Sequence, residues 1–155
     1  MNNKTIFVVR ASGGKGKTGT LRAAANHLLT SHLNFTPVDG AASIVPSEGD
    51  FRIVVGINQK IIAVESAGDP HTQLRERLEE LVHKFKADII LCSSRTKGDT
   101  VDAVNAIQNN YGFETIITST YQVSRDQQNA ANVLKGRHII DLLQDLDILQ
   151  ATGTN

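Results

Sequence analysis

Apolar runs that suit buried strands alternate along the chain with segments whose apolar residues recur at helical spacing. Residues 5–9 form a continuous run rich in β-branched and aromatic side chains, which predicts a strand buried on both faces. Residues 21–29 place three alanines between leucines and predict a helix. Two further apolar runs, at 87–92 and 114–118, predict strands. This alternation is typical of an α/β layered fold with a mostly parallel sheet.

One part of the pattern departs from that alternation. Residues 52–55 and 60–64 are short strand-like runs with only four residues between them, which predicts an antiparallel hairpin over about residues 51–65. Residues 34–50 are rich in Pro, Gly, Ser and Asp and predict a long surface loop, with a short strand at 35–38. Loops of that length in a compact domain tend to be functional or mobile.

Three later segments predict helices. The apolar face of the first is made of Leu74, Leu78, Leu81, Val82 and Phe85. The second helix runs from about residue 100 to 110 and stops at Tyr111 and Gly112. The third begins with a capping box at residues 124–127, and Gly136 is a candidate interruption in it.

The segment between the first predicted strand and the first predicted helix has the sequence RASGGKGKTG at residues 10–19. Its glycines allow the backbone to curl so that N–H groups point at phosphate oxygens, and the helix N-terminus adds partial positive charge. Lys17 is expected to bridge β- and γ-phosphate oxygens, and the Thr18 hydroxyl to coordinate Mg²⁺. Lys15 is either a second phosphate contact or a solvated loop lysine.

Residues 11–18 resemble the Walker A motif of P-loop nucleoside triphosphatases, with Ala11 where the common pattern has glycine. The resemblance implies a three-layer P-loop NTPase-like fold, with Mg²⁺ and a nucleoside triphosphate as cofactors and ATP favoured over GTP. The phosphate-binding residues that it implies are Ser12, Gly13, Gly14, Lys15, Gly16, Lys17, Thr18 and Gly19.

Two classes within that superfamily are comparable in part. Residues 12–18 are similar to the loop of partitioning and nitrogenase-iron-protein-like ATPases, but Ser12 replaces their signature lysine, which weakens the case for dimer-dependent hydrolysis. Small-metabolite kinases share the size of this chain. Arg125 and Arg137 lie too far apart for the arginine-rich lid of such kinases.

Residues that follow predicted parallel strands are the natural site candidates, because ligands sit beyond the carboxyl ends of such strands. Glu65 directly follows Val64, as the acidic residue of a Walker B motif follows its strand, and a carboxylate there could hold Mg²⁺ or activate an attacking hydroxyl. Asp69 is the second choice, and its alternative role is an N-cap with Pro70 at the first helical position. The catalytic candidates are Lys17, Glu65 and Asp69, and the metal candidates are Thr18 and Glu65.

Residues 93–99 also follow a predicted strand. The four residues 96–99 resemble the base-reading motif of GTPases, but they fall one strand too early, and Asp99 as a helix N-cap explains the same residue. Arg95 and Lys97 are candidates for phosphate contacts, with solvated side chains as the alternative.

Composition narrows the classes of function. A chain of 155 residues fits a single domain over 1–155. Sixteen basic and sixteen acidic residues cancel, so neither nucleic acid nor a membrane is an expected partner. Cys92 is the only cysteine, which excludes an internal disulfide and predicts a buried thiol, and the five histidines show no ligand spacing. With no signal peptide and no long apolar segment, the chain is expected to be soluble and cytoplasmic.

Together these patterns predict a protein that binds a Mg²⁺–nucleoside triphosphate and hydrolyses or transfers its γ-phosphoryl group, as an NTPase or a small-molecule kinase. Its further partner is then a small-molecule phosphoryl acceptor or a protein. The alternative is a non-catalytic nucleotide-dependent switch or binding module, in which residues 34–50 sense the γ-phosphate and present a surface to a partner. A third hypothesis is a structural relic that binds only an anion.

Overall fold

The computed structural model describes residues 4–150 of the chain. The elements follow one another as β1 (Thr5–Arg10), α1 (Lys17–Ser31), β2 (Thr36–Pro37), β3 (Arg52–Ile57), β4 (Lys60–Glu65), α2 (Leu74–His83), β5 (Ile89–Ser94), α3 (Asp99–Tyr111), β6 (Glu114–Thr118), the 3-10 turn η1 (Arg125–Gln127) and α4 (Gln128–Asp145).

The strands form one six-stranded mixed sheet in the order β2-β3-β4-β5-β1-β6. β1 pairs in parallel with both β5 and β6, and the register places Val8 beside Cys92 and Ile117. β4 is parallel to β5 and antiparallel to β3, and β2 is antiparallel to β3. The carboxyl ends of β1, β4, β5 and β6 therefore lie at one edge of the sheet, together with the amino end of β3.

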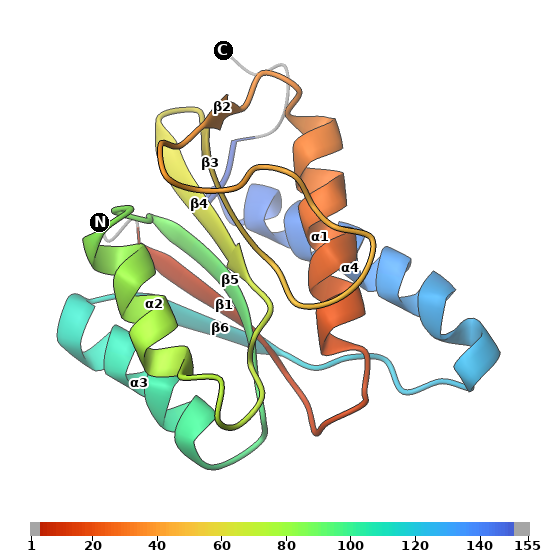
Figure 1. Ribbon diagram of the computed structural model, residues 1–155. Helices are drawn as coiled ribbons and strands as arrows, with labels where there is room; N and C mark the ends of the chain where they lie inside the picture. Colours follow the sequence, from red (N-terminus) through yellow and green to blue (C-terminus); the bar gives the residue numbers. More distant parts are fainter. Residues whose placement is uncertain (1–3, 151–155) are drawn as a thin grey trace.

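Helices cover both faces of the sheet (Figure 1). α1 and α4 lie on one face and α2 and α3 on the other, and each pair closes a separate hydrophobic core. β1 supplies Phe7 and Val9 to the first core and Ile6 and Val8 to the second. A strand with both faces buried needs apolar residues throughout, which explains its continuous apolar run.

The predicted fold class is confirmed as an α/β structure with a mixed, mostly parallel sheet and one antiparallel hairpin. The short strand predicted within 35–38 is β2, and β6 has the predicted bounds. Gly112 ends α3 in a left-handed conformation, with φ of 72°. Cys92 is fully buried, as predicted.

Two expectations for the last helix are wrong. Gly136 does not interrupt α4: a Cβ there would lie 2.5 Å from the backbone nitrogen of Ala24, so this glycine lets α1 and α4 cross in close contact. The predicted capping box is replaced by a 3-10 turn, in which Ser124 Oγ bonds to the side-chain oxygens of Asp126 and Gln127 at 2.8 and 3.0 Å.

Gly136→Leu should lower the free energy of unfolding by about 1–3 kcal/mol, because an added side chain would force the two helices apart. The higher helix propensity of leucine offsets only part of that cost. Urea denaturation measures the change. Asn129→Leu, on the exposed side of α4, is the control and should shift stability by less than about 0.5 kcal/mol. An equal effect of the two substitutions would show that the crossing is not tight.

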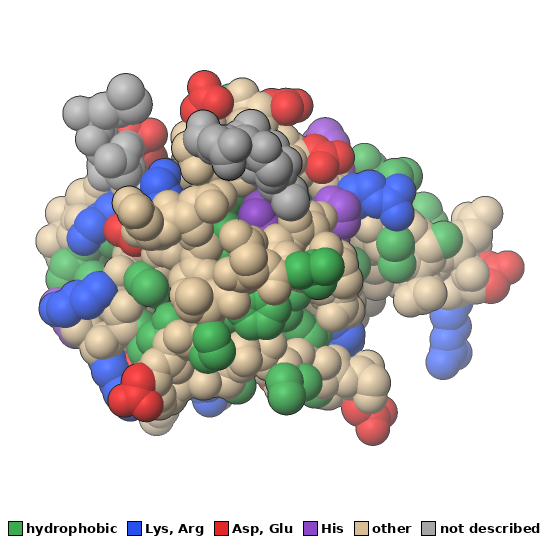
Figure 2. Space-filling model, turned by 90° about the horizontal axis from the view of Figure 1, so that it is seen from above, with side chains coloured by type: hydrophobic (Ala, Val, Ile, Leu, Met, Phe, Trp, Pro, Cys, Tyr) green, Lys and Arg blue, Asp and Glu red, His purple; other side chains and the backbone are tan. Residues whose placement is uncertain are grey.

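The end of the molecule at which the C-terminus lies in Figure 1 has a mixed surface. Figure 2 shows acidic and basic side chains interspersed there, in agreement with the equal numbers of the two kinds in the sequence. Within residues 4–150, no helix combines the length and the apolar character needed to cross a membrane.

Candidate functional site

The glycine loop (residues 11–16) connects β1 to α1 at the edge where the parallel strands end. Gly14 and Gly16 have φ of 73° and 85°, a left-handed conformation that favours glycine. Gly16 occupies the N-cap position of α1, and no side chain of the described residues caps this helix. The N–H groups of the first helical turn are therefore available to an anion.

Lys17 places its ammonium group inside the glycine loop. Only 7% of the residue is exposed, and Nζ donates to the carbonyl oxygens of Ala11 at 3.1 Å and Ser12 at 3.2 Å. Nζ also contacts Oδ1 of Asp69 at 3.4 Å. A buried ammonium needs such acceptors, since burying an unpaired charge is costly. The glycine loop thus holds a cation directly at the start of α1.

Asp69 lies between two cations. Its Oδ1 accepts hydrogen bonds from Arg95 Nε at 2.8 Å and from Lys17 Nζ at 3.4 Å. The hydrogen bond from Arg95 is the main cause that holds the pKa of the Asp69 carboxyl below its ordinary value; partial burial opposes it, and the charge of Lys17 adds to it. Asp69 is therefore an ionised, half-exposed carboxylate at neutral pH.

The alternative role of Asp69 as a helix N-cap is wrong. α2 begins at Leu74, with Gln73 in the N-cap position. His71 and Gln73 have φ of 68° and 59°, so the chain that follows Asp69 is not helical. The Thr72 hydroxyl donates to the Asp69 carbonyl at 2.7 Å and closes this segment into a turn.

The Thr18 hydroxyl contacts a carboxylate that the sequence analysis did not single out. Thr18 Oγ1 donates to Asp50 Oδ1 at 3.3 Å, and Ser66 Oγ donates to the same oxygen at 3.1 Å. Asp50 precedes β3, whose amino end lies beside the carboxyl end of β4 because the two strands are antiparallel. The predicted hairpin carried this signal, since it places the residue before its first strand near the residues after its second.

The end of the long loop is attached to α1. Arg22 donates from Nε to the Pro46 carbonyl at 2.9 Å and from Nη2 to the Gly49 carbonyl at 2.6 Å. The backbone N–H of Phe51 donates to Ser66 Oγ at 2.7 Å. These bonds fix the position of Asp50 relative to Thr18.

Glu65 lies deeper in the structure than the other candidates and is 1% exposed. Its Oε1 accepts from Arg52 Nε at 2.8 Å, and its Oε2 accepts from the backbone N–H of Ala67 at 3.3 Å. Among residues 4–150, the hydrogen bonds of Glu65 do not include one to Thr18 or Lys17. The structure therefore brings Asp50, rather than Glu65, to the Thr18 hydroxyl.

A pocket of about 660 Å³ opens beside Glu65. It is lined by Asp50, Phe51, Arg52, Glu65, Ala67, His71, Thr72, Gln73 and Arg77. Because Asp50 belongs both to this pocket and to the contact with Thr18, the pocket adjoins the glycine-loop site.

Arg95, the residue after β5, extends over the glycine loop. A Cβ at Gly13 would lie 2.6 Å from Arg95 Nη2 and 2.9 Å from Cζ. The guanidinium therefore packs against the backbone of Gly13, in space that the side chain of any other residue would occupy. Together with the bond to Asp69, this contact places Arg95 beside the glycine loop and Lys17.

Lys15 of the glycine loop and Lys97 of residues 93–99 were also predicted as candidates for phosphate contacts. Both are exposed. Asp99 is the first residue of α3 and Gly98 occupies the N-cap position without a side-chain cap bond, so the predicted N-cap role of Asp99 is wrong.

Two amides at the start of α4 support the glycine loop and were missed in the sequence. A Cβ at Gly16 would lie 2.6 Å from Gln128 Nε2, and a Cβ at Gly19 would lie 2.4 Å from Asn132 Nδ2. Asn132 Oδ1 also accepts from Thr20 at 3.3 Å and from Gln128 at 2.9 Å. Their separation of four residues on one helix was the available signal.

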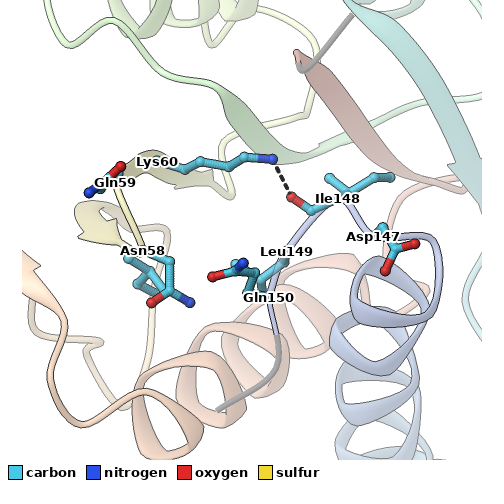
Figure 3. Close-up of a pocket in the computed structure, with 8 residues that line it drawn as sticks. Asn58, Gln59, Lys60, Asp147, Ile148, Leu149 and Gln150 are labelled. Atoms are coloured by element: carbon cyan, nitrogen blue, oxygen red, sulfur yellow. Dashed lines mark hydrogen bonds between the residues drawn. The ribbon is translucent and has the colours of Figure 1, made fainter. Parts of the chain in front are cut away.

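A pocket of about 490 Å³ lies at the other end of the sheet, away from these residues (Figure 3). Residues 57–60 of the hairpin turn and residues 147–150 line it. The Lys60 ammonium points toward the second segment and donates to the Ile148 carbonyl at 2.7 Å (Figure 3). This pocket is therefore separate from the glycine-loop site.

Residues 4–150 contain no cluster of three or more His, Cys, Asp or Glu side chains that could hold a metal ion by themselves. Burial raises the pKa of the Cys92 thiol well above its ordinary value, so this cysteine is not a thiolate ligand at neutral pH.

Comparisons with protein-family models, curated proteins and solved structures gave no match for this chain.

Proposed function

We propose that this protein binds a Mg²⁺–nucleoside triphosphate, with ATP favoured over GTP, and hydrolyses or transfers the γ-phosphoryl group. The observation that carries the proposal is the buried Lys17 ammonium, which is enclosed by the glycine loop at the start of α1. A fixed cation and uncapped helical N–H groups at one place favour an oligophosphate over a neutral ligand.

The glycine loop fits phosphate oxygens in two respects. Gly14 and Gly16 adopt the left-handed conformations that turn backbone N–H groups into an anion-binding concavity. Gly13 leaves room for the Arg95 guanidinium on the loop backbone. A lysine and an arginine at the same loop suit a ligand of high negative charge.

The oxygen donors beside Thr18 fit Mg²⁺. This ion prefers hard oxygen ligands and is commonly held by one or two carboxylates together with substrate phosphates. The Thr18 hydroxyl and the Asp50 carboxylate are 3.3 Å apart and are the residues that would hold it. Bound there, Mg²⁺ would neutralise negative charge that develops on the transferred phosphoryl group.

The proposed reaction needs a nucleophile but little covalent chemistry from the protein. An oxygen of water or of an acceptor attacks the γ-phosphorus, the bond to the β–γ bridging oxygen breaks, and the nucleophile loses a proton. Lys17 and Arg95 would stabilise the charge on the phosphoryl oxygens. Asp69, Asp50 and, across the adjoining pocket, Glu65 are the carboxylates that could align the nucleophile.

Titration calorimetry with ATP and with GTP, each in MgCl₂, tests the proposal. We expect saturable binding of a triphosphate, followed by release of inorganic phosphate or, when small metabolites are supplied, by a phosphorylated acceptor. Binding without turnover would favour the nucleotide-dependent switch. The absence of binding to either triphosphate would overturn the proposal.

Thr18→Ala should weaken triphosphate binding about 10-fold in MgCl₂ and less than 2-fold in EDTA, because only a metal ligand is lost. Calorimetry under the two conditions measures the difference. Thr30→Ala, at the exposed end of α1, is the control and should change neither value. Equal losses of affinity in MgCl₂ and in EDTA would show that Thr18 contributes by packing.

A further inference from the structure

The Asp69 carboxylate occupies a position between cations from two different strand ends. Lys17 begins α1 after β1, Arg95 follows β5, and both donate to the same oxygen of Asp69. Asp69 itself belongs to the segment that follows β4, and its side chain is 55% exposed. A half-exposed carboxylate held by two cations is an anion that another anion can displace.

Arg95 has hydrogen-bonding capacity beyond its bond to Asp69. Nε donates to Asp69 Oδ1, whereas within residues 4–150 its two Nη groups have no protein acceptor. These Nη groups lie on the glycine loop, since Nη2 is 2.6 Å and Nη1 is 3.2 Å from the position of a Cβ at Gly13. A guanidinium presents its donors in a planar fork that matches phosphate oxygens.

We propose that Lys17 Nζ and the Arg95 guanidinium form a subsite for the third phosphate of a nucleoside triphosphate, and that the Asp69 carboxylate competes for it. This inference rests on the proposed function. A terminal phosphate carries more negative charge and more acceptor oxygens than a carboxylate, so it displaces Asp69. A diphosphate supplies one phosphoryl group fewer and leaves Asp69 with Arg95.

The segment that carries Asp69 contains residues in unfavourable backbone conformations, which can relax when Asp69 is displaced. His71 and Gln73, two and four residues further on, have φ of 68° and 59°, which is unfavourable for residues with a side chain. On the other side, Gly68 is pressed against β5, where a Cβ would lie 2.1 Å from the Ser93 carbonyl oxygen. The bonds of Asp69 to the two cations therefore help to hold a strained turn, which displacement by the third phosphate would release.

Affinities of three proteins for ADP and for a non-hydrolysable ATP analogue, measured by calorimetry in MgCl₂, test the subsite. Arg95→Ala should weaken analogue binding about 10-fold or more, the loss expected for one charge-assisted hydrogen bond, and ADP binding less than 2-fold. Asp69→Asn should strengthen analogue binding about 3- to 10-fold, because the competing anion is gone. Arg75→Ala, on the exposed side of α2, is the control and should match the wild type.

Two further measurements keep the test independent of folding defects. Arg95→Lys retains the charge without the fork and should recover part of the analogue affinity. Hydrogen exchange of residues 66–73 in the wild type should be faster with the analogue than with ADP, which a purely structural role of Asp69 would not produce.

Three outcomes overturn the inference. Equal losses for ADP and the analogue in Arg95→Ala would remove the third-phosphate subsite. Weaker analogue binding in Asp69→Asn would make the carboxylate a ligand rather than a competitor. Either of these two results, obtained while the wild-type protein binds nucleotide, would overturn this inference and leave the proposed function standing. The third outcome is a wild-type protein that binds neither ADP nor the analogue, which would overturn the proposed function and this inference together.

Discussion

Lys17→Ala is expected to lower the affinity for ATP at least about 100-fold, because truncating one partner of a buried, hydrogen-bonded charge pair costs about 2–5 kcal/mol. The Lys17 residue is 7% exposed and its ammonium lies inside the glycine loop, so its replacement removes the cation that the proposed phosphate site depends on. Titration calorimetry measures the affinity, and thermal unfolding establishes that the variant is folded.

Lys15→Ala is the matched comparison for that result. It removes a lysine from the same loop, but from an exposed position, and should reduce the affinity far less than Lys17→Ala. Unchanged ATP binding by a folded Lys17→Ala protein would contradict the assignment of the glycine loop as a phosphate site. Similar losses for the two variants would indicate that net charge, rather than position, governs binding.

Asp50→Asn is expected to lower the rate of γ-phosphoryl transfer or hydrolysis about 100-fold or more, the size of the effect of a lost acid–base or metal-binding group. Asp50 is exposed and accepts from the Thr18 hydroxyl, so the amide should change the chemistry at the proposed metal without disturbing a core. Phosphate release at saturating ATP measures the rate. The MgCl₂ concentration that gives half of the maximal rate should also increase.

Glu65→Gln separates the two candidate metal carboxylates. Glu65 is buried and paired with Arg52, so its substitution should lower the melting temperature more than Asp50→Asn does, because it leaves a guanidinium poorly compensated. If Glu65→Gln abolishes turnover at an unchanged melting temperature while Asp50→Asn leaves turnover unchanged, Glu65 is the residue that binds the metal or aligns the nucleophile. If neither substitution lowers turnover, Asp69 is the remaining candidate carboxylate.

Much of the fold could be predicted from the sequence because its signals are local. The continuous apolar run of β1 reflects burial on both faces, and the short separation of β3 and β4 permits only a hairpin. The fully buried Cys92 follows from the apolar run in which it lies. Each of these features depends on neighbouring residues in the chain.

The site was harder to predict because it depends on which strand ends meet. Lys17 and Thr18 follow from the loop sequence, whereas their partners Asp69 and Asp50 come from segments that are remote in sequence. The Asp69-Pro70 pair has the local pattern of a helix start, but α2 begins only at Leu74. The carboxylate of Asp69 contacts Lys17 and Arg95 instead of a helix N-terminus. The position of Glu65 after Val64 indicates a site residue, yet Arg52 on the adjacent strand pairs with it.

The position of β1 between β5 and β6 has a consequence for how the chain acquires its structure. β1 is synthesised before both of its neighbours, β5 and β6, and α1 is synthesised before α4, the helix that it packs against. Such long-range pairing makes folding slow, because the chain loses conformational entropy in bringing distant segments together before their contacts can stabilise the structure. During synthesis, the glycine loop therefore stays without its supporting amides until Gln128 and Asn132 have left the ribosome.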